Sequence, residues 1–96
     1  MNAKHYGIVW TNQFKKDCKL AMKRQLEIEL LDDIIRKLAR GEQLPEKSKD
    51  HALAGNGGGY RECRIMPDWL LVYRMENDLL VLTLARTGTH SGLSGN

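Results

Sequence analysis

The sequence has few of the residues that build disulfide-linked or metal-bound folds. Its 96 residues include two cysteines and three histidines, scattered along the chain. This scatter gives no metal-ligand spacing, so we expect no metal ion and no other cofactor. Cys18 and Cys63 fall at predicted core positions of a helix and a strand, where cysteine acts as a small buried hydrophobe in a reducing compartment. A disulfide between them is therefore not expected.

Long apolar runs are also missing. No stretch approaches the roughly 20 apolar residues that a membrane-spanning helix requires. The segment Met1–Tyr6 lacks the apolar core of a secretory signal. We therefore expect a cytoplasmic protein with no membrane partner. A chain of which 42% is hydrophobic and 28% charged is expected to form one globular domain over residues 1–96.

Positive charge is what the sequence has in excess, with a formal net charge of +3. It is concentrated in residues 15–24 and again in residues 36–40. Lys15, Lys19 and Lys23 recur at helical spacing and share one face of the predicted helix. Such a cluster suits a polyanion or an acidic protein partner. Taken alone, however, the charge favours an ordinary solvated helix face.

Hydrophobic periodicity predicts a strand and then two helices. The segment His5–Trp10 is a β-branched and aromatic run, typical of an opening strand. Apolar residues then recur at helical spacing in two segments, the first after an N-cap at Thr11 or Asn12 and the second before a C-terminal Gly41. The residues expected to face inward are Phe14, Cys18, Ala21 and Met22 in the first, and Ile28, Leu31, Ile34, Ile35 and Leu38 in the second. The two helices form a helical hairpin.

The rest of the chain predicts a loop followed by strands. Residues 42–59 contain a proline, a charged stretch and a glycine-rich run, so they predict a long loop that is either functional or disordered. Strands are expected over Tyr60–Met66, Trp69–Met75 and Leu79–Arg86, before a polar tail. The order β-α-α-β-β-β predicts an α+β fold, in which the helical hairpin packs on one face of an antiparallel sheet. The other face is left free to form a cleft.

Five polar residues are expected to meet near that cleft. Strand alternation puts Arg64 on the face opposite the apolar residues of its strand. His51 precedes the glycine run, Asp68 lies in a turn, and Arg86 and His90 lie at or beyond the end of the last strand. Histidine, aspartate and arginine supply what phosphodiester cleavage needs: a base for the ribose 2′-OH, an acid for the leaving oxygen and a guanidinium for the phosphorane-like charge. Each residue also has a structural interpretation, because polar residues are common in turns. Trp69 is expected in the core, although at a turn it could also stack on a base.

Four motifs resemble the YafQ branch of the RelE/ParE toxin superfamily in their order and spacing. They are Lys49–Leu53, Gly59–Cys63, Pro67–Tyr73 and Arg86–Ser91. The resemblance covers nearly the whole chain and implies the RelE-like fold. It also implies a ribosome-dependent endoribonuclease that cuts mRNA in the ribosomal A site without metal. The partner it implies is an acidic cognate antitoxin, which wraps the toxin in a hetero-oligomer. The resemblance implies contact with operator DNA only through this toxin–antitoxin complex.

The resemblance also assigns roles to individual residues. His51, Asp68 and His90 match family residues implicated in catalysis. Trp69 and Arg86 match residues implicated in the site or its support. The basic first helix, with Lys15, Lys19 and Lys23, becomes an expected contact for ribosomal RNA.

Two departures from the family pattern leave alternatives open. The family usually has a histidine where this chain has Arg64, and a bulky apolar residue where it has Ser94. Arginine cannot act as a base near neutral pH, so Arg64 either binds phosphate or attenuates the enzyme. The alternatives are a RelE/ParE-fold toxin that poisons a protein target, and an inactive homologue that only binds an antitoxin or regulates an operator.

Overall fold

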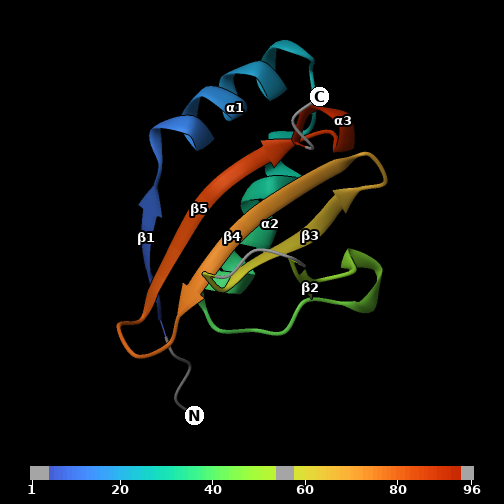
Figure 1. Ribbon diagram of the computed structural model, residues 1–96. Helices are drawn as coiled ribbons and strands as arrows, with labels where there is room; N and C mark the ends of the chain where they lie inside the picture. The colour runs from blue at the N-terminus through green and yellow to red at the C-terminus, as the bar shows by residue number, and fades with distance from the viewer. Residues whose placement is uncertain (1–4, 54–57, 94–96) are drawn as a thin grey trace.

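Five strands pair into one sheet, in the order β1-β5-β4-β3-β2 (Figure 1). The computed structural model describes residues 5–53 and 58–93, except for the side chains of His90 and Ser91. The strands are β1 Gly7–Trp10, β2 His51–Ala52, β3 Tyr60–Met66, β4 Trp69–Glu76 and β5 Val81–Gly88. The helices are α1 Asn12–Lys23, α2 Ile28–Ala39, the 3-10 helix η1 Glu46–Ser48 and the short α3 His90–Leu93.

The predicted α+β fold is confirmed, with one refinement of its sheet. Strands β2, β3, β4 and β5 pair with one another in antiparallel fashion, as expected. Strand β1 instead runs parallel to β5, so the sheet is mixed rather than wholly antiparallel. A parallel pair needs a long crossover connection, and the whole of the chain between β1 and β5 supplies it.

Both long helices end as their sequences predict. The Thr11 hydroxyl accepts a hydrogen bond from the Phe14 N–H at 3.1 Å and caps α1. Gly41 has φ 72° and occupies the position after the C-cap of α2. Its N–H donates to the Leu38 carbonyl at 2.9 Å, which satisfies one of the last carbonyls of α2.

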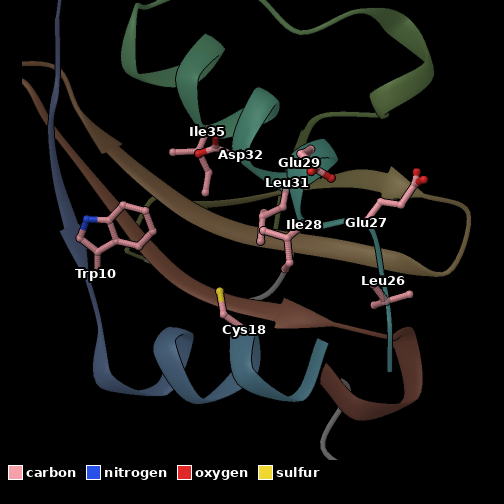
Figure 2. A pocket seen from close by; sticks show the side chains of 9 residues that line it. All are labelled: Trp10, Cys18, Leu26, Glu27, Ile28, Glu29, Leu31, Asp32 and Ile35. Carbon is pink, nitrogen blue, oxygen red and sulfur yellow. The ribbon is translucent and has the colours of Figure 1, made fainter. Parts of the chain in front are cut away.

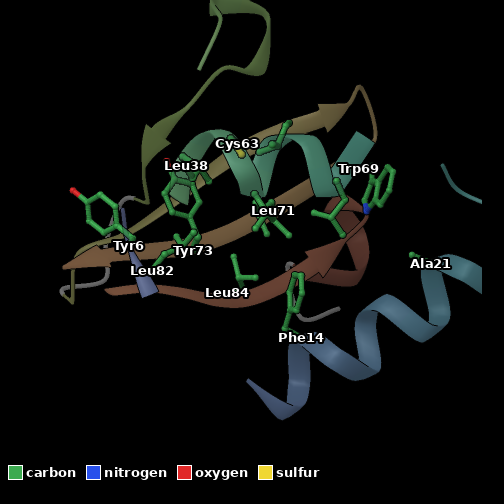
Figure 3. Packing of buried hydrophobic residues seen from close by; sticks show 13 residues of the cluster. Tyr6, Phe14, Ala21, Leu38, Cys63, Trp69, Leu71, Tyr73, Leu82 and Leu84 are labelled. Atoms are coloured by element: carbon green, nitrogen blue, oxygen red, sulfur yellow. The ribbon is translucent and has the colours of Figure 1, made fainter. Parts of the chain in front are cut away.

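The core lies between the helices and one face of the sheet (Figure 3). Helix α2 lies across this face, whereas α1 lies along the β5 side of the sheet (Figure 1). Because α1 sits at the side, its buried stripe runs through Phe14, Asp17 and Ala21. Met22, which was expected inside, is 55% exposed for this reason. The fully buried strand residues are Cys63, Trp69, Leu71, Tyr73, Leu82 and Leu84.

Two segments that were expected to be irregular form short elements. The predicted loop over residues 42–59 contains η1 and β2, and β2 pairs with β3 through His51 and Glu62. The predicted polar tail begins with α3, whose Leu93 N–H donates to the Thr89 carbonyl at 2.9 Å. The elements η1, β2 and α3 are all too short to give a hydrophobic periodicity in the sequence. Within the described residues, no helix is long and apolar enough to cross a membrane.

Candidate active site

The face of the sheet away from the helices carries the polar residues of β3 and its neighbours. The register aligns Glu62 with Arg86 across β4, and Arg64 with Gly88. His51 stands opposite Glu62 on the other side, in β2. Residues directly opposed in a sheet share a face, and neighbouring strands are about 4.8 Å apart. The structure therefore puts His51, Arg64 and Arg86 on one face of the sheet, which we call the open face, with His51 and Arg86 three strand spacings apart.

His51 has an oxygen near each ring nitrogen. Its Nδ1 lies 2.6 Å from the Lys49 carbonyl, and its Nε2 lies 3.3 Å from the Glu62 Oε1. The carbonyl can only accept, so it fixes a proton on Nδ1. Nε2 is then the ring nitrogen that can exchange a proton with a substrate. The ring is 56% exposed, which leaves Nε2 within reach of a bound molecule.

The turn that carries His51 is anchored in the sheet through the preceding residue. The Asp50 carboxylate accepts a hydrogen bond from the Tyr73 hydroxyl at 2.6 Å and one from Arg61 Nε at 3.3 Å. Burial, followed by the hydrogen bond to Asp50, raises the pKa of Tyr73, so its hydroxyl stays protonated and donates. Lys49 closes the turn in the left-handed region, with φ 52°. A side chain of β4 thus fixes the backbone from which His51 projects.

Arg64 is half-buried on the open face. Its Nε atom is shielded from solvent, and among the described residues none accepts a hydrogen bond from it. A buried guanidinium N–H without an acceptor is unfavourable, so this N–H would gain stability from an oxygen acceptor that reached it. The prediction that Arg64 faces away from Cys63 is confirmed, because Cys63 is buried in the core.

Asp68 and His90 lie at one end of the sheet. Asp68 is exposed in the turn between β3 and β4, and lines a hollow of about 420 Å³. Thr89, the residue before His90, lines the same hollow. His90 begins α3, but its side chain lies outside the described residues, as does the whole of Ser94. The backbone therefore puts His90 near Asp68, and no contact between their side chains is described.

Trp69 is a core residue. It is 2% exposed, and its indole N–H donates to the Thr87 hydroxyl at 2.9 Å. A ring in this position cannot stack on a base unless the core opens. The core interpretation of Trp69 therefore holds, and direct contact with substrate does not fit this structure. Its available role is to support the turn that carries Asp68.

Arg86 is held by Asp17, a residue that no sequence motif singles out. Its Nε donates to Asp17 Oδ2 at 2.8 Å, and its Nη2 donates to Asp17 Oδ1 at 3.3 Å. The first of these hydrogen bonds raises the pKa of the guanidinium, which keeps it charged. The available signal was a carboxylate on the apolar stripe of a helix, between Phe14 and Ala21.

The predicted basic stripe of α1 is present at the surface. Lys15, Lys19 and Lys23 are all exposed, and no described carboxylate lies within ion-pair distance of them. A hollow of about 540 Å³ lies between α1 and α2, away from the open face (Figure 2). Its lining is mainly apolar, with three carboxylates and no histidine or arginine. The groups suited to phosphate chemistry are therefore on the open face rather than in this hollow.

The match to a protein family decides what kind of protein carries this site. Residues 6–95 match the model of a family described as the bacterial toxin of type II toxin–antitoxin systems, YafQ. The chain belongs to the YafQ toxin family. It is 39% identical over 89 residues to the mRNA interferase toxin YafQ of Escherichia coli strain K12, which is 92% of this chain and 95% of that relative. The resemblance inferred from the four motifs is thus confirmed.

Solved structures of bacterial toxins have the same fold. The crystal structure of the E. coli DinJ–YafQ toxin–antitoxin complex matches with a TM-score of 0.88 and 37% identity, over 95% of this chain and 99% of that chain. A metal-bound toxin from Helicobacter pylori matches with a TM-score of 0.87 and 38% identity, over 92% and 98%. In the described part of this YafQ-family chain, no three metal-ligating side chains form a cluster.

Proposed function

We propose that the protein is a ribosome-dependent endoribonuclease, which cleaves mRNA in the ribosomal A site and is neutralised by a cognate antitoxin. The observation that carries the proposal is the open face, where an imidazole and two guanidinium groups stand on the side of the sheet away from α2. Its relative from E. coli is named an mRNA interferase, which gives this set of groups a matching substrate class.

The proposed chemistry is an attack by the ribose 2′-OH on the adjacent phosphate. A base takes the 2′-OH proton, the 2′ oxygen bonds to phosphorus, and the bond to the 5′ oxygen breaks as an acid protonates that oxygen. We assign proton transfer to His51, through Nε2, together with Asp68 and His90. Arg64 and Arg86 stabilise the charge that develops on the phosphate oxygens. These guanidiniums supply the positive charge, so the scheme requires no metal ion.

Arg64 can serve this scheme only as a cation. Arginine does not release its proton near neutral pH, so it cannot replace a histidine in proton transfer. Its partly buried position and its shielded Nε suit a phosphate oxygen. If proton transfer at this position limits the rate, the enzyme is attenuated. A protein that binds an antitoxin or another target without cutting RNA is the alternative.

Two partners follow from the proposed function. Lys15, Lys19 and Lys23 form an exposed stripe, and a polyanion such as ribosomal RNA fits its charge. The second partner is an acidic antitoxin that wraps the toxin, with operator DNA reached only through that complex. The DinJ–YafQ complex of E. coli supports this, because a toxin of the same fold is bound there by its antitoxin.

Primer extension on a defined mRNA tests the proposal. The purified toxin is added to a translation system with and without ribosomes, and with and without a chelator. We expect new 5′ ends within A-site codons only when ribosomes are present, at the same rate with chelator. Absence of cleavage by a folded protein that still inhibits translation would favour the protein-binding alternative.

A further inference from the structure

Helix α1 meets strand β5 at a buried carboxylate. Asp17 is 9% exposed and lies between Phe14 and Ala21 on the buried stripe of α1. A charged group in such a position is costly unless hydrogen-bond partners satisfy it. The partners of Asp17 therefore indicate what the position does.

Both oxygens of Asp17 are used. The two hydrogen bonds from Arg86 reach one oxygen each, at 2.8 and 3.3 Å. The Thr87 backbone N–H donates to Oδ2 at 3.1 Å, and the Gln13 amide donates to Oδ1 at 3.1 Å. A guanidinium that donates hydrogen bonds to both oxygens of a carboxylate is fixed in orientation as well as in position.

The end of β1 explains why this contact exists. β1 pairs with β5 only as far as Leu84, so the following part of β5 has α1 beside it instead of a strand. The Thr11 hydroxyl donates to the Leu84 carbonyl at 2.9 Å, and Asp17 accepts from Thr87. Buried backbone groups at a strand edge need such partners. The Asp17 carboxylate therefore satisfies a backbone N–H at the edge of β5 and also holds Arg86, the neighbouring residue.

We propose that Asp17 is the positioning residue for Arg86 and that helix α1, through this pair, sets the guanidinium at the scissile phosphate. The inference rests on the proposed function, because Arg86 has this role only if the site cleaves RNA. Arginine has five N–H donors, of which Asp17 engages two, and the Arg86 side chain is 41% exposed. Free donors thus remain for a phosphate. Lys15 and Lys19 lie on the same helix, so a surface that binds ribosomal RNA is joined rigidly to the site.

The first test is Asp17→Asn, which keeps the size of the side chain and removes its charge. Single-turnover cleavage on programmed ribosomes should slow by about 10- to 100-fold, the scale expected when a reacting group is misplaced by about 1 Å. The ribosome concentration needed for half-saturation should stay within about twofold, because the lysines are unchanged. Asp33→Asn is the matched control: Asp33 is an exposed carboxylate of α2, paired with Lys37 at 3.3 Å. It should keep the parental rate.

A double-mutant cycle separates positioning from general damage. In an Arg86→Ala background, Asp17→Asn should cause no further loss of rate beyond about twofold, because the guanidinium through which Asp17 affects cleavage is gone. An equal loss with and without Arg86 would overturn the proposal, as would a parental rate in Asp17→Asn alone.

The second measurement does not depend on cleavage. The Hε proton of Arg86, followed by NMR at low temperature, should exchange slowly in the parent and faster, with a shifted signal, in Asp17→Asn. If the exchange rate and chemical shift of the Arg86 Hε proton are the same in Asp17→Asn as in the parent, the contact between Asp17 and Arg86 is wrongly assigned. If the parent cuts no mRNA, the proposed function fails, whereas the Hε signal still decides whether Asp17 fixes Arg86. If Asp17→Asn does not fold, Asp17→Glu replaces it, and a parental rate together with a displaced Hε signal would overturn the positioning role.

Discussion

The covered face and the open face of the sheet are held in different ways. On the covered face, Leu71, Leu82 and Leu84 are completely buried, so close packing fixes them from all sides. On the open face, His51 and Arg86 are fixed by a few hydrogen bonds and ion pairs. Substitutions on the covered face should therefore change stability, and substitutions on the open face should change activity. Five experiments would break or sharpen this separation.

The largest effect on activity is expected at the end of the sheet. Asp68→Ala and His90→Ala should each slow mRNA cleavage by about 10²–10⁴-fold, the range for loss of a proton-transfer group. Both positions follow strand ends, and Asp68 is exposed, so little packing is lost. The measurement is cleavage on programmed ribosomes, with melting curves to confirm that both variants fold. Full activity in both variants would mean that the active site lies elsewhere in the protein.

The largest effect on stability is expected for Leu71→Ala. Leu71 is completely buried between the sheet and the helices, and truncation of such a leucine costs about 2–5 kcal/mol. Val72→Ala, on the neighbouring residue of the open face, should cost less, because Val72 is only half-buried. Urea denaturation of the two variants measures the difference. Equal losses would mean that the open face contributes to the fold as much as the core does.

Alkaline pH should weaken the covered face through Cys63. Burial raises the pKa of this thiol from 9.0 to about 12. The unfolded chain ionises the thiol above its ordinary pKa while the folded chain does not. The free energy of unfolding should therefore fall by about 1.4 kcal/mol per pH unit as the pH rises from 9.0 to about 12. Urea titrations across this range measure the slope.

Cys63→Ala should remove this part of the slope. Cys18→Ala should remove a smaller part, because burial also raises the pKa of this half-buried thiol. Burial also raises the pKa of Tyr73 from its ordinary value of 10.0, so a second loss in the same direction begins above about pH 10 and steepens the slope there. A parent whose stability stays constant through this range would contradict the expected burial of the thiol.

Variants of the lysine stripe of α1 test whether residues outside the open face contribute to ribosome binding. Changing Lys15, Lys19 and Lys23 together to Glu should weaken ribosome binding by about tenfold or more and reduce its dependence on salt, because fewer counterions are released. Sedimentation with ribosomes at several salt concentrations measures both quantities. Changing Arg36, Lys37 and Arg40 of the α2 end to Glu provides a control of equal charge. If the α1 variant binds ribosomes with unchanged affinity and unchanged salt dependence, the lysine stripe is an ordinary solvated surface.

Arg64→His is expected to have the smallest effect, and in the opposite direction. Histidine can transfer a proton near neutral pH, so cleavage should rise by roughly tenfold if that step is limiting. A new pH dependence near neutrality should appear, with little change in stability. Single-turnover rates of both proteins from about pH 5.5 to 8.5 provide the comparison. If the variant is no faster than the parent, Arg64 is a working phosphate-binding residue.

The sequence predicts the covered face better than the open one, for a physical reason. The periodicity of the α2 residues Leu31, Ile35 and Leu38 is a local signal, and all three are buried as expected. The parallel pairing of β1 and the side position of α1 depend on contacts between distant segments, which leave no periodic trace. The exposure of Met22 follows from the same cause.

The candidate site shows the same limit. Strand alternation was enough to put Arg64 on the face opposite Cys63, because the pattern has a period of two residues. It could not reveal that Asp17 holds Arg86, since the two residues are 69 positions apart. Nor could it show that a two-residue strand sets His51 beside Glu62. Single residues in short elements and long-range ion pairs need the three-dimensional structure.

The parallel pairing of β1 with β5 has a consequence for synthesis of the protein. In the described sheet β1 has no strand partner other than β5, and β5 also separates β1 from β4. Contacts between segments so distant in sequence form late, because a long loop must close first. A nascent chain cannot complete its sheet, or bring Arg86 to Asp17, until residues 81–88 have emerged. Under the proposed function, the chain cannot act on the ribosome that makes it before residues 81–88 have emerged.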